Sequence, residues 1–265
     1  MPSNSSKVKN GRAESVNNIL ISQPRPGRSP YFDLADKYDI QIDWRPFIHV
    51  EPVAEREFRK NRIRPEEFTA IILTSKNSID HFFRMCNDMR VSMPQSTKYF
   101  CLSEAIANYL QKFIVYRKRK VFVGMRRVED LAPYLLKHKA SEKFLLPCSN
   151  LGSKPVTEFL DDKEFDYKEA MMYRTVSSDL SDLAEITYDI LVFFSPLGIQ
   201  SLYDNFPDFK QRNTRIAVYG ASTSLAVEER GLTINIQAPA PDVPSMSMAL
   251  DKYLQVANLQ NGSGE

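Results

Sequence analysis

The chain has 265 residues, 43% of them hydrophobic and 26% charged, which is ordinary for a globular protein and fits one large domain or two small ones. Its formal net charge of +2 argues against a nucleic-acid-binding protein, in which basic residues gather on one face. Three cysteines without a close pair and three scattered histidines argue against a disulfide framework and a metal site. With no apolar run of roughly 18 residues and no signal-peptide pattern, we expect a cytoplasmic protein.

Short apolar runs alternate with amphipathic stretches between two polar ends, 1–18 and 259–265, which we expect to be a disordered and a flexible tail. The predicted strands are short and several are apolar throughout, as in parallel strands that are buried on both faces. In chain order they cover residues 19–22, 40–44, 70–73, 99–102, 121–123, 144–146, 190–194, 215–219 and 234–236. Helices are expected between the strands, so the pattern predicts the α/β class.

Two short motifs recur along the chain in the same order. The motif around Ser75 resembles one around Ser195, which lies 120 residues later, and the motif around Ser103 resembles one around Ser222, 119 residues later. Two motifs at nearly the same offset indicate two copies of one α/β unit.

The first predicted strand and helix precede both copies, so we expect one copy to be inserted in the other. We predict a first lobe made of residues 19–46 and 177–258 and a second lobe made of residues 47–176. The two crossings fall in extended, β-prone runs near 46–52 and 171–176, which can pair as a two-stranded antiparallel ladder and act as a hinge. The predicted fold is therefore two similar parallel-sheet, flavodoxin-like lobes with a ligand in the cleft between them.

Small hydroxyl residues recur where predicted strands pass into helices. Such turns leave backbone N–H groups free at a helix N-terminus, where the helix dipole also stabilises an anion. Capping alone can explain any single turn, but the repetition favours a ligand with several anionic groups. The candidate binding residues are Arg25, Thr74, Ser75, Asn77, Ser103, Cys148, Ser149, Asn150, Ser195, Pro196, Gly198, Gly220, Ser222 and Thr223.

Two further features stand outside these turns. The run from Tyr116 to Lys120 is basic, and it is either a solvated edge or a contact for nucleic acid. Tyr173 lies in the second predicted hinge strand, where its hydroxyl is expected near the cleft, with ordinary sheet packing as the alternative. The chain has no GxGxxG and no phosphate-loop lysine motif, so we expect no nucleotide cofactor.

The ordered set of motifs resembles the uroporphyrinogen-III synthase family. The most specific part is the run 173–176, Tyr-Arg-Thr-Val, followed shortly by Phe194-Ser195-Pro196. The resemblance implies two α/β lobes, one inserted in the other and joined by a two-stranded ladder. The other matching stretches are residues 19–25, 72–78, 145–150, 217–223 and 238–239.

This resemblance implies a cyclising hydro-lyase of haem and tetrapyrrole biosynthesis. It would close hydroxymethylbilane to uroporphyrinogen III, with inversion of the last pyrrole ring and loss of water. The resemblance implies no metal, cofactor, membrane or nucleic-acid partner, and a monomer that can receive this linear tetrapyrrole from hydroxymethylbilane synthase. It makes Tyr173 the catalytic candidate, as a hydrogen-bond donor to the departing hydroxyl group, and it gives the hydroxyl turns binding roles.

The chain departs from the family pattern in the turn around Ser103. Cys101 and Glu104 stand where the family has glycine and threonine, and the Glu104 carboxylate would repel an acidic substrate. The alternative function is a non-catalytic member of the same fold that binds a tetrapyrrole or another anion.

Overall fold

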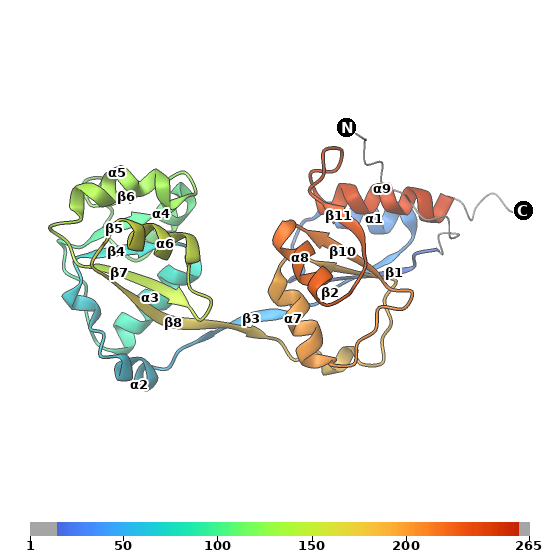
Figure 1. The fold of residues 1–265 in the computed structure, drawn as a ribbon, viewed down its shortest axis with the longest axis horizontal. Helices are drawn as coiled ribbons and strands as arrows, with labels where there is room; N and C mark the ends of the chain where they lie inside the picture. The colour runs from blue at the N-terminus through green and yellow to red at the C-terminus, as the bar shows by residue number, and fades with distance from the viewer. Residues whose placement is uncertain (1–14, 260–265) are drawn as a thin grey trace, which may run out of the picture. The chain divides into compact units, whose positions relative to one another are not determined.

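The computed structural model describes residues 15–259, which form two compact units (Figure 1). The first unit contains the described residues up to His49 and those from Ser177 onward, and the second contains Val50–Val176. The chain therefore leaves the first unit once and returns once. The sequence predicted these two changes at 46/47 and at 176/177.

The first unit is a five-stranded parallel sheet with helices on both faces. Its strands are β1 (Asn18–Ile21), β2 (Gln41–Trp44), β9 (Ile190–Phe193), β10 (Arg215–Tyr219) and β11 (Ile234–Ala238), in the order β11-β10-β9-β1-β2. Successive side chains of β1 alternate between the faces: Ile19 and Ile21 pack against α1 (Pro30–Tyr38) and α9 (Met246–Leu259). Leu20 lies in the opposite core, which α7 (Pro196–Asn205) and α8 (Ala221–Glu229) cover.

The second unit contains a six-stranded sheet with the order β3-β8-β7-β4-β5-β6. Its strands are β3 (Ile48–Pro52), β4 (Ala70–Leu73), β5 (Lys98–Cys101), β6 (Val121–Val123), β7 (Phe144–Ser149) and β8 (Tyr167–Ser177). All pairs are parallel except β3 with β8, which is antiparallel. The helices are α2 (Glu55–Phe58), α3 (Lys76–Asp88), α4 (Glu104–Leu110), α5 (Val128–His138) and α6 (Lys154–Asp162). Helices α2, α3 and α4 pack into the core on one face of this sheet, and α5 and α6 cover its other face.

The two sheets have the same internal arrangement. The parallel series β8-β7-β4-β5-β6 corresponds strand for strand to β2-β1-β9-β10-β11, although the chain enters the two series at different strands. Ser75 follows β4 and Ser195 follows the corresponding β9. This confirms the predicted fold of two similar parallel-sheet lobes. In such sheets ligands bind at the carboxyl ends of the strands, next to the place where the strand order reverses. That place lies between β4 and β7 in one sheet and between β9 and β1 in the other, and the two serines follow β4 and β9.

Among the described residues, the structure differs from the prediction at both tails, in β7 and in β8. The strand β7 continues past the predicted end at Leu146 to Ser149, so Cys148 and Ser149 belong to the strand rather than to a turn. Val16 is buried in the first core and its backbone N–H donates to Asn258 Oδ1 over 3.0 Å, so residues 16–18 belong to the fold rather than to a tail. Leu259 is the last residue of α9, and residues 1–14 and 260–265 of the predicted tails lie outside the described residues. The strand β8 begins at Tyr167, earlier than expected, because Lys168 and Glu169 are exposed and give no apolar signal.

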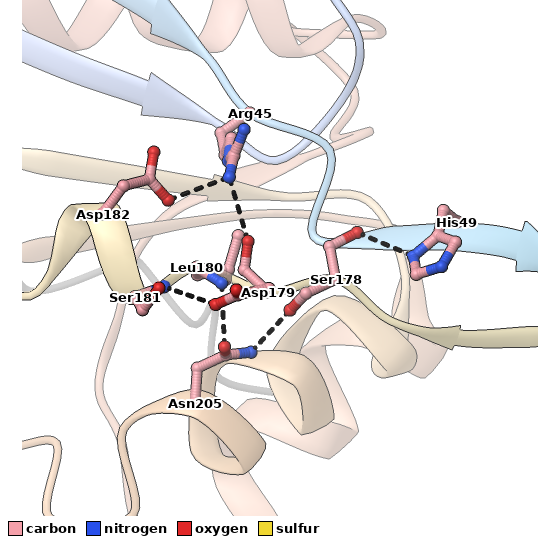
Figure 2. Close-up of polar contacts among 8 residues, drawn as sticks. All are labelled: Arg45, His49, Ser178, Asp179, Leu180, Ser181, Asp182 and Asn205. Carbon is pink, nitrogen blue, oxygen red and sulfur yellow. Dashed lines mark hydrogen bonds and ion pairs between the residues drawn. The ribbon is translucent and has the colours of Figure 1, made fainter.

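A polar network fixes the segment with which the chain re-enters the first unit (Figure 2). Arg45 Nη2 donates to the Asp179 carbonyl oxygen over 2.9 Å and to Asp182 Oδ1 over 2.8 Å. The Asn205 amide accepts from the Leu180 N–H and donates to the Ser178 carbonyl oxygen, over 2.9 and 2.8 Å. The ends of both crossing segments are therefore held by side chains of the first unit.

Candidate functional site

The turn between β4 and α3 is closed by two serines of the same helix end. Ser75 is the N-cap of α3, and its Oγ accepts from the Ser78 N–H over 3.0 Å. The Ser78 hydroxyl donates to the Ser75 carbonyl oxygen over 2.7 Å and accepts from the N–H groups of Thr74 and Ser75, over 3.2 and 3.1 Å. This reciprocal pairing fixes the Ser75 side chain at the carboxyl edge of the sheet.

Tyr173 reaches the same place from β8. It lies opposite Ser149 of β7 in the parallel register, just after a bulge, and its hydroxyl oxygen is 3.5 Å from Ser75 Oγ. Its ring stacks on that of His81, with centroids 4.8 Å apart and the planes inclined by 18°. Tyr173 is 7% exposed, and this burial raises the pKa of its hydroxyl above the ordinary value. The phenol therefore keeps its proton at neutral pH and can donate it or a hydrogen bond.

His81 is held neutral beside this tyrosine. The pKa of His81 is lowered below its ordinary value, mainly by burial and to a smaller extent by the positive charge of Arg84. Arg84 Nε donates to His81 Nδ1 over 3.4 Å, and its Nη2 donates to the carbonyl oxygens of Val53 and Met172, over 2.9 and 3.1 Å. With Nδ1 acting as the acceptor, the ring carries its proton on Nε2.

We expect the second unit to lose stability as the pH falls below the ordinary histidine range. Because the folded-state pKa of His81 is lowered, the unfolded chain binds its proton more readily, so the stabilisation is complete above pH about 6.5 and is lost toward the lower folded-state value. His138 of the same unit shifts in the same direction and adds to the effect. Urea unfolding of wild type and of His81→Gln between pH 7.5 and 5 measures it. An equal pH dependence in both proteins would contradict the contribution of His81.

The polar side chains at the end of β7 and in the turn after it bond mainly to the neighbouring backbone. Both polar groups of the Asn150 amide pair with the Thr175 backbone, over 2.8 and 3.3 Å, and Ser149 Oγ accepts from the Leu151 N–H. Cys148 is buried and lies 3.9 Å from Glu169 Oε2; burial raises the pKa of this thiol to about 11. The thiol stays protonated, so it is not an activated nucleophile. These residues line an open pocket of about 590 Å³.

The other predicted residues of the second unit are more open. Thr74 is half-buried beside Ser75, and Asn77 is exposed in the first turn of α3. Ser103 is the N-cap of α4, but its side chain makes no capping bond. Its hydroxyl is therefore available to a ligand, although the exposed Glu104 follows directly.

In the first unit, Ser195 caps α7 through a 3.3 Å bond from the Gly198 N–H to its Oγ, with Pro196 as the first helical residue. A Cβ atom on Gly198 would lie 3.2 Å from the Phe193 ring and 3.8 Å from Ser22 Oγ. This close approach explains the glycine, and it places Ser22, which the sequence analysis did not select, beside the Ser195 turn.

The turn before α8 has one accessible hydroxyl. Gly220 adopts φ of 88°, a conformation that side chains disfavour, and Ser222 is exposed. Thr223 is buried, which does not favour direct contact between its side chain and a ligand. The Arg25 guanidinium is 5.4 Å from the centre of the Phe32 ring, and Arg25 lines a 340 Å³ pocket together with Asp43 and Asp182.

The structure thus brings Ser75, Ser149 and Tyr173 together in the second unit, and Ser22, Ser195 and Gly198 in the first.

Sequence reasoning missed Ser78, His81 and Ser22. Ser78 has a signal, because a hydroxyl three residues after an N-cap serine is the position of a capping box. His81 shows only helical spacing, one turn beyond Ser78, and nothing in the sequence pairs it with Tyr173.

Comparison with known proteins decides the family. The family described as Uroporphyrinogen-III synthase HemD matches residues 31–247. The chain belongs to the uroporphyrinogen-III synthase family. A curated relative, the uroporphyrinogen-III synthase of Chlorobaculum parvum, is 23% identical over 251 residues, covering 89% of this chain and 99% of the relative.

Solved structures of this family share the fold. The structure of uroporphyrinogen-III synthetase from Helicobacter pylori is 17% identical, covers 91% of this chain and 99% of its own, and superposes with a TM-score of 0.58. A mutant uroporphyrinogen III synthase from Thermus thermophilus is 14% identical, covers 92% and 99%, and has a TM-score of 0.54. At these identities the structures establish the fold alone.

Residues 15–259 contain no group of three or more histidine, cysteine or acidic side chains placed to hold a metal ion. No helix among them is both long and apolar enough to cross a membrane.

Proposed function

We propose that the protein is a uroporphyrinogen-III synthase, a hydro-lyase that cyclises hydroxymethylbilane to uroporphyrinogen III with inversion of the last pyrrole ring. The family match over residues 31–247 carries this proposal. The curated relative, which is aligned over nearly its whole length, supports it.

In the proposed reaction Tyr173 assists the departure of the hydroxyl group. The carbon–oxygen bond of the terminal hydroxymethyl group breaks, and the hydroxyl leaves as water after it takes a proton, directly from the phenol or through a water molecule. Inversion of the last ring needs two new carbon–carbon bonds and one broken bond. The terminal carbon bonds to the substituted α-carbon of this ring, the bond from that α-carbon to its methylene bridge breaks, and the bridge re-bonds to the free α-carbon. The free α-carbon releases one proton, so the phenol is restored. The protonated state of Tyr173, with its raised pKa, supports this role.

The remaining contribution of the protein is to hold the substrate in a ring-closing geometry. Substrate carboxylates are stabilised by hydroxyl and N–H groups of the turns, with Ser75 and Ser195 as the best-positioned candidates at the carboxyl edges of their sheets. Proximity and orientation account for large rate gains in reactions of this kind, in which the reacting groups belong to one molecule.

We further propose that the protein works as a cytoplasmic monomer and takes its substrate from hydroxymethylbilane synthase. The three cysteines, all free and buried, support a reducing compartment. The product of that synthase is the substrate proposed here, and direct transfer would limit its spontaneous closure.

The test is to generate hydroxymethylbilane in situ, add the protein and separate the uroporphyrin isomers after oxidation. Spontaneous closure gives isomer I, so the enzyme is expected to give isomer III in excess over a blank without protein. An unchanged isomer ratio would overturn the proposed function and favour a non-catalytic binding protein on this fold.

Substrate capture is expected to weaken as salt is added. Carboxylates bound at exposed turns are screened by ions, whose Debye length falls from about 10 Å at 0.1 M to about 3 Å at 1 M. The Michaelis constant should therefore rise severalfold over this range while kcat changes less. Steady-state kinetics are measured with added sodium chloride and, as a control for osmotic effects, with sucrose at equal osmolarity. A Michaelis constant that does not change with salt argues against electrostatic capture.

A further inference from the structure

The second unit contains a cavity of about 330 Å³ away from the Ser75 turn and from Tyr173. It lies at the amino ends of two parallel strands, because Thr97 directly precedes β5 and Val121 opens β6. Ser75 follows the carboxyl end of the neighbouring β4, so the cavity and the Ser75 turn lie at opposite ends of the strands. The apolar and aromatic wall is made by Phe83, Met93, Tyr99, Phe113, Ile114 and Val121.

The mouth of this cavity exposes apolar surface to solvent. Phe113 is 38% exposed and stacks on Phe83 with centroids 4.8 Å apart, and Val115 is 82% exposed. The wall also holds an unsatisfied polar group: Thr97 is 2% exposed, and its hydroxyl has no hydrogen-bond partner among the described residues. A polar ligand atom that paired with this hydroxyl would satisfy it, which favours a ligand with a polar group.

The rim of the cavity is cationic. Arg117 and Lys120 line it, and no acidic residue does. Both donate to Gln95, Lys120 to its carbonyl oxygen and Arg117 to its Oε1 over 3.4 Å. The pKa of Lys120 is lowered, mainly by partial burial and to a smaller extent by the nearby positive charges of Arg117, Arg119 and Lys98. Throughout residues 15–259, no carboxylate forms an ion pair with any cation of the 117–120 run, so their charge is uncompensated.

We propose that this cavity is a second binding site of the protein, specific for a small amphipathic anion with an apolar body and one acidic head. The body would lie against Phe113 and Phe83, and the head would pair with Arg117 and Lys120. The volume is at the lower end of small-molecule pockets, about 300–1,000 Å³, which suits one or two rings or a medium alkyl chain rather than four linked pyrroles. This gives the basic run a role other than a solvated edge or a nucleic-acid contact.

Calorimetric titration of the full-length protein tests this site with matched probes. Naphthalene-1-sulfonate and decanoate represent aromatic and aliphatic anions, and 1-naphthalenemethanol and decanol are their uncharged counterparts. We expect saturable binding of at least one anion, with its uncharged counterpart bound about tenfold or more weakly. Which anion binds more tightly identifies the ligand class. Equal affinity for charged and uncharged probes would overturn the proposal.

Two double variants with the same loss of charge locate the binding. Arg117→Gln with Lys120→Gln should weaken anion binding about tenfold or more, while the glutamines can still hydrogen-bond to residue 95. Lys118→Gln with Arg119→Gln, in the same run but not in the cavity wall, should weaken it about twofold at most. Equal losses in the two variants, or none in either, would overturn the site. Phe113→Ala, which removes part of the wall, should weaken both anions, and unchanged binding there would also overturn it.

Discussion

Replacing Tyr173 by phenylalanine is expected to lower turnover severalfold to about a hundredfold, which reaches the lower end of the about 10²–10⁴-fold that a positioned general acid contributes. The ring can still stack on His81, so only the hydroxyl and its contact with Ser75 are lost. Steady-state formation of isomer III in the presence of excess substrate measures the effect. The Michaelis constant should change much less than kcat, because the donor acts in the transition state rather than in substrate binding.

The matched control for this variant is Tyr167→Phe. Tyr167 belongs to the same strand β8, and its hydroxyl donates to Asp161 over 2.9 Å on the exposed surface. We expect near-normal turnover in this control. Because the pKa of Tyr173 is raised, wild-type kcat should also not fall through ionisation of this phenol below pH about 10. Wild-type turnover in Tyr173→Phe would remove the hydroxyl from the mechanism.

Ser78→Ala is expected to lower the free energy of unfolding of the second unit by about 2–4 kcal/mol. Ser78 is fully buried, and its hydroxyl is the acceptor for the N–H groups of Thr74 and Ser75. Alanine leaves both donors without this partner, at about 1–3 kcal/mol for each buried group. The same change frees the Ser75 turn opposite Tyr173, so turnover should fall as well, although Ser78 itself is not expected to touch the substrate.

Two serine variants calibrate this prediction. Ser75→Ala removes one cap bond and should cost about 1 kcal/mol, and Ser141→Ala, at an exposed position, should cost less than about 0.5 kcal/mol. Urea unfolding followed by circular dichroism gives all three values. A larger loss in Ser75→Ala than in Ser78→Ala would contradict the assignment of Ser78 as the residue that holds the turn.

Much of the fold was readable because its signals are local. The strands Ala70–Leu73, Val121–Val123 and Arg215–Tyr219 begin and end as predicted, since each is a largely apolar run between polar turns. The start of β8 was missed because Lys168 and Glu169 are exposed there and hide the strand's period. The duplication of the Ser75 and Ser195 turns was also visible in the sequence, because equivalent strands place equivalent hydroxyls.

The surroundings of Tyr173 depended on tertiary structure. Ser75 and Tyr173 are 98 residues apart and meet only because the sheet order places β7 between β4 and β8, so the two strands are separated by a single strand. His81 looked like one polar residue on an amphipathic helix, and the stacking that puts it against Tyr173 has no counterpart in sequence spacing. The cavity beside Arg117 and Lys120 likewise could not be read from the sequence, because its wall comes from several separate segments of the chain. The sequence by itself determined the class of fold, the family and the hydroxyl turns, whereas the neighbours of each turn followed from strand order, which a linear pattern does not encode.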